Sequence, residues 1–437
     1  MSRVRFHGGR ILDPARGVDR VADLVVDQGR VVGIAPSAGA ADGEQVVDAR
    51  GLLIAPGFVD LHCHLREPGY EYKETFASGI AAALAGGFTS LCAMPDTLPT
   101  VETASDVMHV LAASRRIETA KVYPLGSVTK GQAGQELSEM ADMADAGAVA
   151  FSDDPRSIAS SGLMRHALEY SLLTRRPIVA CCEDRELARG AVMNEGRVSA
   201  RLGLRGAPPA AEEIALARDL ALARLTGGRL HVAHLSTAGS VRLLQSARDE
   251  GLHVTADVTP HHLTLTDDWL DGSQAMPPYD SRCRVDPPLR TADDCEALQE
   301  ALAQGIIDCV ATDHSPHARI DKECELAFAA PGISALETAF GMLMGLVHGG
   351  RLSLETLIAR LTRDPARVFG LPAGSLEPGA QADLVLLDPD LEWTVRGDAF
   401  RSKGRYTPLE GSRLRGRVVL TMVGGRIVHR LEQLTHA

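Results

Sequence analysis

Short apolar stretches alternate with amphipathic stretches through the middle of the chain. The apolar stretches are rich in Val and Ile and end in turns, as buried strands do, and most of them precede apolar residues at helical spacing. The first such strand ends at His62. The pattern predicts further strands at 88–93, 121–126, 148–151, 177–181, 229–234, 253–258 and 306–312, and helices most clearly at 210–225, 238–250, 292–303 and 334–347.

Strands and helices that alternate eight times over about 250 residues predict an α/β fold of the (β/α)8 TIM-barrel type. The main alternative is a doubly wound open sheet. It is disfavoured because no Gly-rich dinucleotide-binding sequence follows the first strand.

Both ends of the chain have a different pattern, of short β-rich pieces separated by Gly turns. Two such fragments would each be marginally stable alone, so we expect the ends of the chain to pair. The predicted domains are a β-sandwich built from residues 1–55 and 371–437 and a metal-dependent barrel of residues 56–370. The β-rich pieces lie at 4–6, 22–27, 30–34, 382–387 and 417–428.

Side chains that can bind metals follow five of the eight predicted strands. The catalytic side chains of TIM barrels lie at these carboxyl ends, and His62 and His64 point the same way if their strand continues. Taken singly, an Asp pair can cap a helix and a His can be a core residue. Together the residues predict a metal centre with an open position for water. The other polar strand ends are 151–154, 181–184, 231–234 and 312–317.

The composition narrows the class of function. A net charge of -12 and an aromatic fraction of 4% argue against nucleic-acid binding, and an anionic substrate would need a specific arginine. No apolar run approaches the roughly 20 residues of a membrane span, and the N-terminus lacks the apolar core of a secretory signal. We therefore expect a cytoplasmic protein without a membrane or nucleic-acid partner. The eight scattered cysteines are expected to be reduced.

A set of motifs along nearly the whole chain resembles those of the dihydroorotases of the amidohydrolase superfamily. In chain order the motifs are GFVDLHCHLREPG, MPDT, AFSDD, HVAHLST, VTPHHLTLT, DPPLR, ATDHSPH and PGISALETAF. They look most like the class I branch, in which an Asp and not a carboxylated Lys bridges the metals. Hydantoinases and allantoinases would carry that Lys near 149–151, where this chain has Val-Ala-Phe.

The resemblance implies two zinc ions per chain, with one departure among their ligands. Cys181 stands where the family has His. A thiolate is a competent zinc ligand but adds negative charge. Three outcomes are open: Cys181 binds the second zinc, Cys182 or a water replaces it, or the second site is weak or absent. Cys181 can also be only a small buried packing residue. The implied ligands are His62, His64 and Asp313 for the first zinc, Asp154 as the bridge, and Cys181 and His234 for the second.

The substrate pocket implied by the resemblance also shows departures. Asp96 and Asp286 stand where the family usually has Asn. A carboxylate beside an anionic substrate is unfavourable unless it is protonated or turned away. Arg66 and His317 remain, so the pocket is weakened but not abolished. The implied substrate-binding residues are His64, Arg66, Asp96, Asp286, His317, Pro331 and Gly332.

The expected reaction is the reversible hydrolysis of the cyclic amide dihydroorotate to N-carbamoyl-L-aspartate in pyrimidine (UMP) biosynthesis. Asp313 is expected to act as general base and then as general acid, and Arg66 to hold the substrate carboxylate with its planar fork. His314 and His261 are candidates to support the site. If the segment is extended, His261 and His262 point to opposite faces.

Two alternatives stay open. The altered Asp96 and Asp286 allow a related cyclic amidase, hydantoinase-like or allantoinase-like. The second alternative is a metal-free dihydroorotase-like subunit that supports aspartate carbamoyltransferase. A homodimer is the family-level expectation for assembly, and the sequence leaves open whether the loop 317–331 closes over the substrate.

Overall fold

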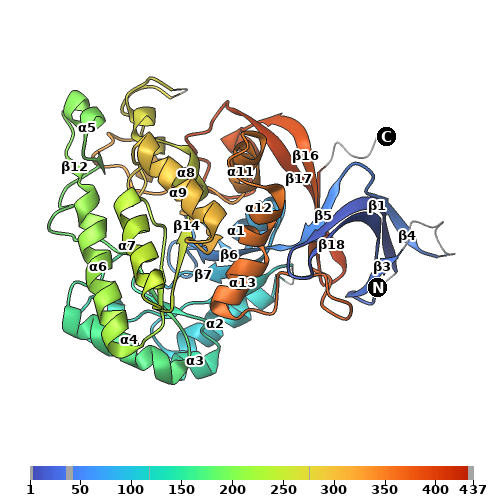
Figure 1. Cartoon of the computed structure of the whole chain (residues 1–437), viewed down its shortest axis with the longest axis horizontal. Coiled ribbons are helices and arrows are strands. Elements are labelled where there is room, and N and C mark those ends of the chain that lie inside the picture. Colours follow the sequence, from blue (N-terminus) through green and yellow to red (C-terminus); the bar gives the residue numbers. More distant parts are fainter. Residues whose placement is uncertain (1–2, 36–42, 118, 275, 432–437) are drawn as a thin grey trace.

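The computed structural model describes residues 3–35, 43–117, 119–274 and 276–431. Figure 1 shows helices arranged around short central strands, with a curved sheet beside them that contains strands from both ends of the chain. Within the described ranges, no helix is long and apolar enough to cross a membrane.

All eight predicted barrel strands are present, which confirms the barrel. They form two runs of parallel strands, β6-β7-β8 and β9-β10-β13-β14-β15. Parallel bridges from Gly126 to Phe151 and from Cys63 to His314 join the runs at both seams and close the cylinder. The strands are β6 (Phe58–Cys63), β7 (Phe88–Ala93), β8 (Lys121–Pro124), β9 (Phe151–Ser152), β10 (Ile178–Ala180), β13 (Leu230–Val232), β14 (Val254–Val258) and β15 (Cys309–Val310).

Helices surround the barrel, and three of the four predicted most clearly agree closely with the structure. They are α6 (Pro209–Thr226), α7 (Ala238–Asp249) and α9 (Ala292–Gln304). The threonines before α7 and α9 cap them by accepting backbone N–H groups. The other helices are α1 (Phe76–Ala85), α2 (Ala104–Arg115), α3 (Met140–Ala146), α4 (Ser161–Thr174), α5 (Arg197–Leu202), α8 (Pro260–Thr264), α10 (Arg319–Lys322), α12 (Leu354–Leu361) and α13 (Arg363–Phe369).

The helix predicted at 334–347 begins later than expected, because α11 spans Ala339–His348. Ser334 Oγ donates a hydrogen bond to the carbonyl of Gly404 (2.8 Å), and Glu337 accepts one from the backbone N–H of Arg401 (2.8 Å). These bonds hold 334–337 against a distant segment and take the place of a first helical turn. The start at 334 was therefore wrong.

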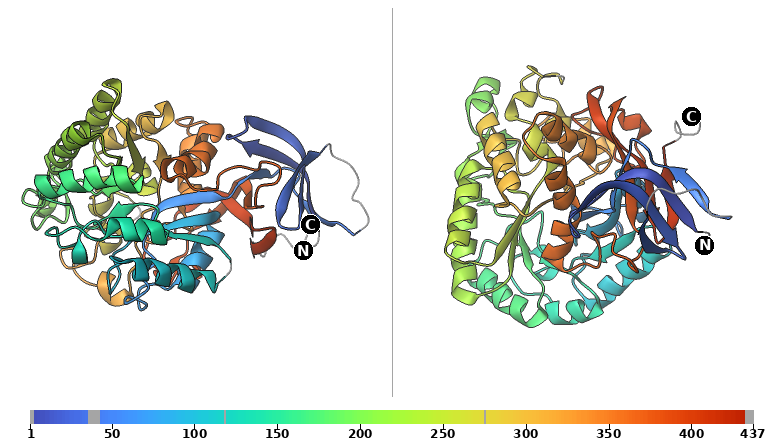
Figure 2. Two further views of the ribbon diagram at one scale, coloured as in Figure 1. Left: turned by 90° about the horizontal axis from the view of Figure 1, so that it is seen from below. Right: turned by 45° about the vertical axis from the view of Figure 1, so that its right-hand side comes forward.

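The two ends of the chain form one β domain, as predicted. Its eight-stranded sheet has the order β18-β17-β16-β5-β1-β2-β3, with β4 on β1, so the C-terminal β16 pairs with the N-terminal β5. Phe6, Leu24, Leu384 and Leu420 share one core inside it. Figure 2 shows the strands from both ends of the chain lying together in this domain. The domain limits at 55 and 370 stay predictions. The strands are β1 (Val4–Asp13), β2 (Val18–Asp27), β3 (Arg30–Ala35), β4 (Gln45–Asp48), β5 (Leu53–Pro56), β16 (Leu384–Thr394), β17 (Arg413–Val423) and β18 (Arg426–Arg430); β11 (Met193–Asn194) and β12 (Gly206–Ala207) pair separately.

A buried carboxylate locks the seam between the first and last barrel strands. Asp60 on β6 is fully buried, and its two oxygens accept the backbone N–H of Thr312 (2.8 Å) and its hydroxyl (2.5 Å). Further along the same two segments, the N–H of His64 donates to the carbonyl of His314 (2.9 Å). The segments that carry His62 and Asp313 are thereby fixed side by side.

Replacing Asp60 with Ala removes both bonds and leaves the buried Thr312 groups without an acceptor. We expect Asp60→Ala to lower the free energy of unfolding by about 2–3 kcal/mol in urea titrations. Asp48→Ala is the matched control, because Asp48 is exposed and binds the side chain and backbone N–H of Arg50 at the surface, so its loss should cost less than about 1 kcal/mol. Equal losses of unfolding free energy in the two variants would show that the buried bonds of Asp60 contribute no more to stability than an exposed ion pair.

Candidate metal centre and substrate pocket

Four side chains from three distant segments meet at the carboxyl end of the barrel. Oδ1 of Asp154, which follows β9, lies 3.3 Å from Nε2 of His62 and 3.6 Å from Nε2 of His64. Oδ1 of Asp313, which follows β15, lies 3.7 Å and 3.4 Å from the same two nitrogens. All four side chains are buried. The structure therefore brings together the four residues predicted around a first ion.

Asp154 also belongs to a second group of donors. Its Oδ2 lies 3.1 Å from Nε2 of His234, and ligand atoms of Asp154, Cys181 and His234 all lie within 4.8 Å of one another. One oxygen of Asp154 thus faces the His62–His64 pair and the other faces His234. Because the carboxylate has a donor group on each side, its geometry is that of a bridge between two ions.

The donors fit divalent metal ions. Both ring nitrogens of His62 are buried and have no hydrogen-bond partner in the part of the chain that the structure describes. Buried imidazole nitrogens usually have a hydrogen-bond partner, so the His62 ring is suited to binding a ligand that the protein does not itself supply. Nitrogen, carboxylate and thiol donors in groups of three or four are the set that zinc prefers.

Three residues at the site have a backbone conformation that is rare for side-chain-bearing residues. Arg66, His234 and Asp313 have φ angles of 61°, 39° and 44°. Such left-handed positions cost energy and persist where the surrounding structure enforces them, commonly at functional sites. Here the strained turns aim each side chain from the end of its strand into the same space.

Burial and charge set the protonation states of the donors. Burial opposes ionisation of Asp154, but the charges of His62 and His234 hold the pKa of this carboxyl well below its usual value. Asp313 is likewise shifted to a low pKa, against its burial, by His64 and His62. Burial raises the pKa of the Cys181 thiol to about 12. An ion bound by Cys181 must therefore displace a proton, as zinc does at thiol ligands.

Asp96 makes contacts that the sequence did not suggest. Its two oxygens bind Nδ1 of His64 (2.7 Å) and NH1 of Arg66 (2.6 Å), while NH2 of Arg66 donates to Ser315 Oγ (2.7 Å). Burial lowers the pKa of His64, but the charge of Asp96 together with the hydrogen bonds to Asp313 and Asp96 raises it to about 9. Asp96 is therefore neither turned away nor left uncompensated, because two cationic partners balance its charge.

The predicted anion-binding His317 already has protein partners on both ring nitrogens. Its Nε2 donates to the carbonyl of Pro331 (2.7 Å), and its Nδ1 lies 3.2 Å from Nζ of Lys73. Nearby, the buried Lys322 donates to the carbonyls of Ala330 (2.8 Å) and Gly332 (2.9 Å). These bonds hold the two ends of the loop 317–331 together, and Lys73 contacts the loop from outside it. Lys73 and Lys322 carry no sequence signal that would have marked them.

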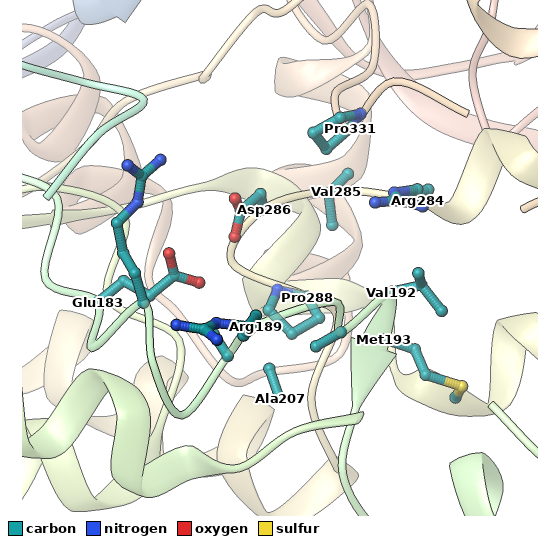
Figure 3. A pocket seen from close by; sticks show the side chains of 13 residues that line it. Glu183, Arg189, Val192, Met193, Ala207, Arg284, Val285, Asp286, Pro288 and Pro331 are labelled. Atoms are coloured by element: carbon teal, nitrogen blue, oxygen red, sulfur yellow. The ribbon is translucent and has the colours of Figure 1, made fainter. Parts of the chain in front are cut away.

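A cavity of about 220 Å³ is lined mainly by residues of the segments 183–193 and 284–288 (Figure 3). Asp286, Glu183 and Pro331 line it, and the two carboxylates face one another across part of it. Burial raises the pKa of Asp286, the charge of His234 opposes the rise, and the charges of Asp154 and Asp313 add to it, so Asp286 lies within electrostatic reach of the donor cluster. Glu183 was not among the predicted site residues, although it belongs to the polar strand end 181–184.

The segment with two adjacent histidines is helical and not extended. Pro260 starts α8, and the side chain of Thr259 caps it. The opposite orientation expected of His261 and His262 in an extended segment therefore does not apply. Nε2 of His262 donates to the carbonyl of Pro287 (2.9 Å). His314 contacts Glu74 through Nε2 (3.4 Å), which fits the supporting role expected for it.

The chain is similar to known proteins over its whole length. A dihydro-orotase-like family matches residues 51–240, and the amidohydrolase family matches residues 210–429. A dihydroorotase of Anaeromyxobacter dehalogenans is 50% identical over 430 residues, 98% of each chain. A dihydroorotase of Syntrophus aciditrophicus is 43% identical over 428 residues, which are 98% of this chain and 99% of the other. Among solved structures, an L-hydantoinase (dihydropyrimidinase) of Arthrobacter aurescens has a TM-score of 0.87 at 27% identity and covers 98% of this chain and 96% of its own.

Cys181 and Cys182 provide a matched pair for testing the second donor group. Cys182 is buried with its sulfur towards Asp219 (3.8 Å), whereas Cys181 lies with Asp154 and His234. In protein loaded with Co²⁺, we expect a thiolate-to-cobalt absorption band that Cys181→Ser abolishes and Cys182→Ser retains. A band that survives Cys181→Ser would exclude Cys181 as a ligand.

The contact of Asp96 with His64 predicts an effect on ion binding. A carboxylate that orients a ligating imidazole commonly contributes 10- to 100-fold in affinity, so Asp96→Ala should weaken Zn²⁺ binding by about that factor in chelator competition. Asp96→Asn keeps an acceptor for His64 but loses the charge opposite Arg66. We expect its Zn²⁺ affinity to lie between those of the wild-type protein and Asp96→Ala. Unchanged affinity in Asp96→Ala would contradict the role.

Proposed function

The chain belongs to the dihydroorotase family of the amidohydrolases, and we propose on this premise that it catalyses the reversible hydrolysis of dihydroorotate to N-carbamoyl-L-aspartate. The observation that carries the proposal is the sharing of Asp154 by two donor groups at the mouth of a barrel, in which every donor except the partly exposed Cys181 is buried. A cyclic amide is a poor electrophile, and a site of this kind is suited to activating both the amide and the water that attacks it.

We propose zinc as the metal, with two ions per chain. A divalent ion at such a site lowers the pKa of a bound water and polarises a carbonyl oxygen. The mixture of imidazole, carboxylate and thiol donors supports zinc over magnesium or calcium, which prefer oxygen ligands. The proposed ligands are His62, His64, Asp154 and Asp313 for one ion and Asp154, Cys181 and His234 for the other.

Asp313 is the proposed proton carrier. Its low pKa keeps it ionised at neutral pH, and its Oδ1 lies among the donor atoms of the first group, 3.4 Å from Nε2 of His64. An ionised carboxylate at this position can accept the proton of the attacking water and return it to the ring nitrogen when the amide bond breaks. One residue would then serve as general base and general acid in turn.

Arg66 is proposed to bind the carboxylate of the substrate. Asp96 and Ser315 hold its two terminal nitrogens, and its buried Nε has no hydrogen-bond partner among the described residues. The guanidinium plane is thus fixed while N–H groups remain for an anion. The wider proposed pocket comprises His64, Arg66, Asp96, Asp286, His317, Pro331 and Gly332.

Three further features remain proposals for this chain. We expect a homodimer, an association with aspartate carbamoyltransferase is a second mode of assembly to test, and the expected location is the cytoplasm. The class of the enzyme supports these expectations, since dihydroorotate chemistry belongs to central metabolism.

The reaction is tested with purified protein and a panel of three cyclic amides: dihydroorotate, hydantoin and allantoin. We expect dihydroorotate to be cleaved fastest, and Asp313→Asn to lower kcat by about 1,000-fold because the proton carrier is lost. Asp390→Asn is the control, since Asp390 pairs with Arg415 on the surface of the terminal sheet.

The other outcomes would favour a different function or contradict the role of Asp313. Faster cleavage of hydantoin or allantoin would favour the related cyclic amidase. No cleavage of any of the three by metal-loaded protein would favour a non-catalytic subunit. Undiminished turnover in Asp313→Asn would contradict the proposed proton carrier.

A further inference from the structure

A second cavity, of about 410 Å³, lies where α11 meets β16, β17 and β18 of the terminal sheet. It shares no lining residue with the cavity lined by Asp286 and Glu183. We call it the arginine pocket. Its polar lining consists mainly of Arg396, Arg401, Arg417, Arg430, His429 and Glu337.

The charge in the arginine pocket is unusual for this protein. Four guanidinium groups face a single carboxylate, Glu337, although the chain as a whole has a net charge of -12. Glu337 is occupied by the backbone N–H groups of Arg401 (2.8 Å) and Ser402 (3.2 Å). Within the described residues, no carboxylate lies within 4.0 Å of any of the four guanidinium groups. The described lining therefore carries four arginines against the single carboxylate of Glu337 and has an excess of positive charge.

Arg417 is the most constrained of these cations. Its guanidinium carbon lies 4.7 Å from the centre of the Trp393 ring, and the ring is held by a hydrogen bond from Nε1 to the carbonyl of Gly416 (3.1 Å). Arg417 is only partly exposed, and burial lowers its pKa. A half-buried charge without an ion pair carries a desolvation cost that a bound anion would relieve.

The neighbours of Arg417 strengthen this reading. Burial lowers the pKa of His429 to about 4, and the charges of Arg401 and Arg417 contribute to the shift, so these cations converge on one space. His429 is then neutral at pH 7 and can donate a hydrogen bond without adding charge. The apolar part of the lining includes Trp393, Phe340 and Phe400.

These features point to one class of ligand. Guanidinium forks match the oxygens of a phosphate, and aromatic and guanidinium planes stack on flat rings. The cavity is larger than a bare phosphate requires and falls in the size range of small-molecule sites. We propose that the arginine pocket binds a nucleoside phosphate, with the phosphate on Arg401 and Arg417 and the base near Trp393.

The fluorescence of Trp393 provides a direct assay. The chain has two tryptophans, so a Trp269→Phe parent leaves Trp393 as the only one. We expect UMP and AMP to change its emission with saturation, whereas uridine, which lacks the phosphate, should not bind measurably. Inorganic phosphate should compete with the nucleotides but bind more weakly.

Substitutions separate this pocket from general surface charge. Arg417→Gln and Arg401→Gln should each weaken nucleotide binding by about tenfold, as expected for the loss of one charge-assisted contact. Arg415→Gln is the matched control, since Arg415 lies on the same strand but pairs with Asp390 outside the pocket. Arg401 is exposed, so its variant keeps the test valid if Arg417→Gln does not fold.

The proposal is overturned if neither nucleotide binds at millimolar concentration, if uridine binds as tightly as UMP, or if Arg401→Gln and Arg415→Gln have equal effects. Binding of an acidic peptide with no binding of nucleotides would also overturn it and would assign the pocket to a protein partner. The assay uses no cyclic amide, so its outcome is independent of the proposed hydrolysis.

Discussion

The closure of the barrel between β6 and β15 is the constraint on which the rest of the structure depends. Asp60 binds both polar groups of Thr312 in a fully buried position, and His64 binds the backbone of His314 next to it. Without this seam, the histidines at the end of the first barrel strand and Asp313 after the last one would not be held next to each other. The position of the donors follows from the closure and not from any local sequence property.

Within the closed barrel, balanced charge shapes the site. Two of its carboxylates have cationic or imidazole partners on both sides: Asp154 has His62 and His234, and Asp96 has His64 and Arg66. This balance explains how an Asp can stand at position 96, where the family usually has Asn. The carboxylate is not an obstacle to an anionic substrate, because it neutralises and orients the groups that surround it.

The sequence was sufficient for the features that repeat or that end a strand. The apolar periodicity predicted eight strands, and the polar residues after them predicted a metal centre. The resemblance to dihydroorotases implied donors at 62, 64, 154, 181, 234 and 313, which the structure brings together in two groups around Asp154. Contacts between distant side chains were not predictable in this way. The pairing of Asp96 with Arg66, the bond from His317 to Pro331 and the late start of α11 all depend on partners that only the folded chain brings near.

The most direct test is an anomalous diffraction map collected at the zinc absorption edge from crystals of the purified protein. We expect two peaks on either side of Asp154, one about 2.0–2.2 Å from ligand atoms of His62, His64 and Asp313, the other about 2.0–2.3 Å from those of Cys181 and His234. Peaks located elsewhere, or none at the mouth of the barrel, would contradict the shared metal centre.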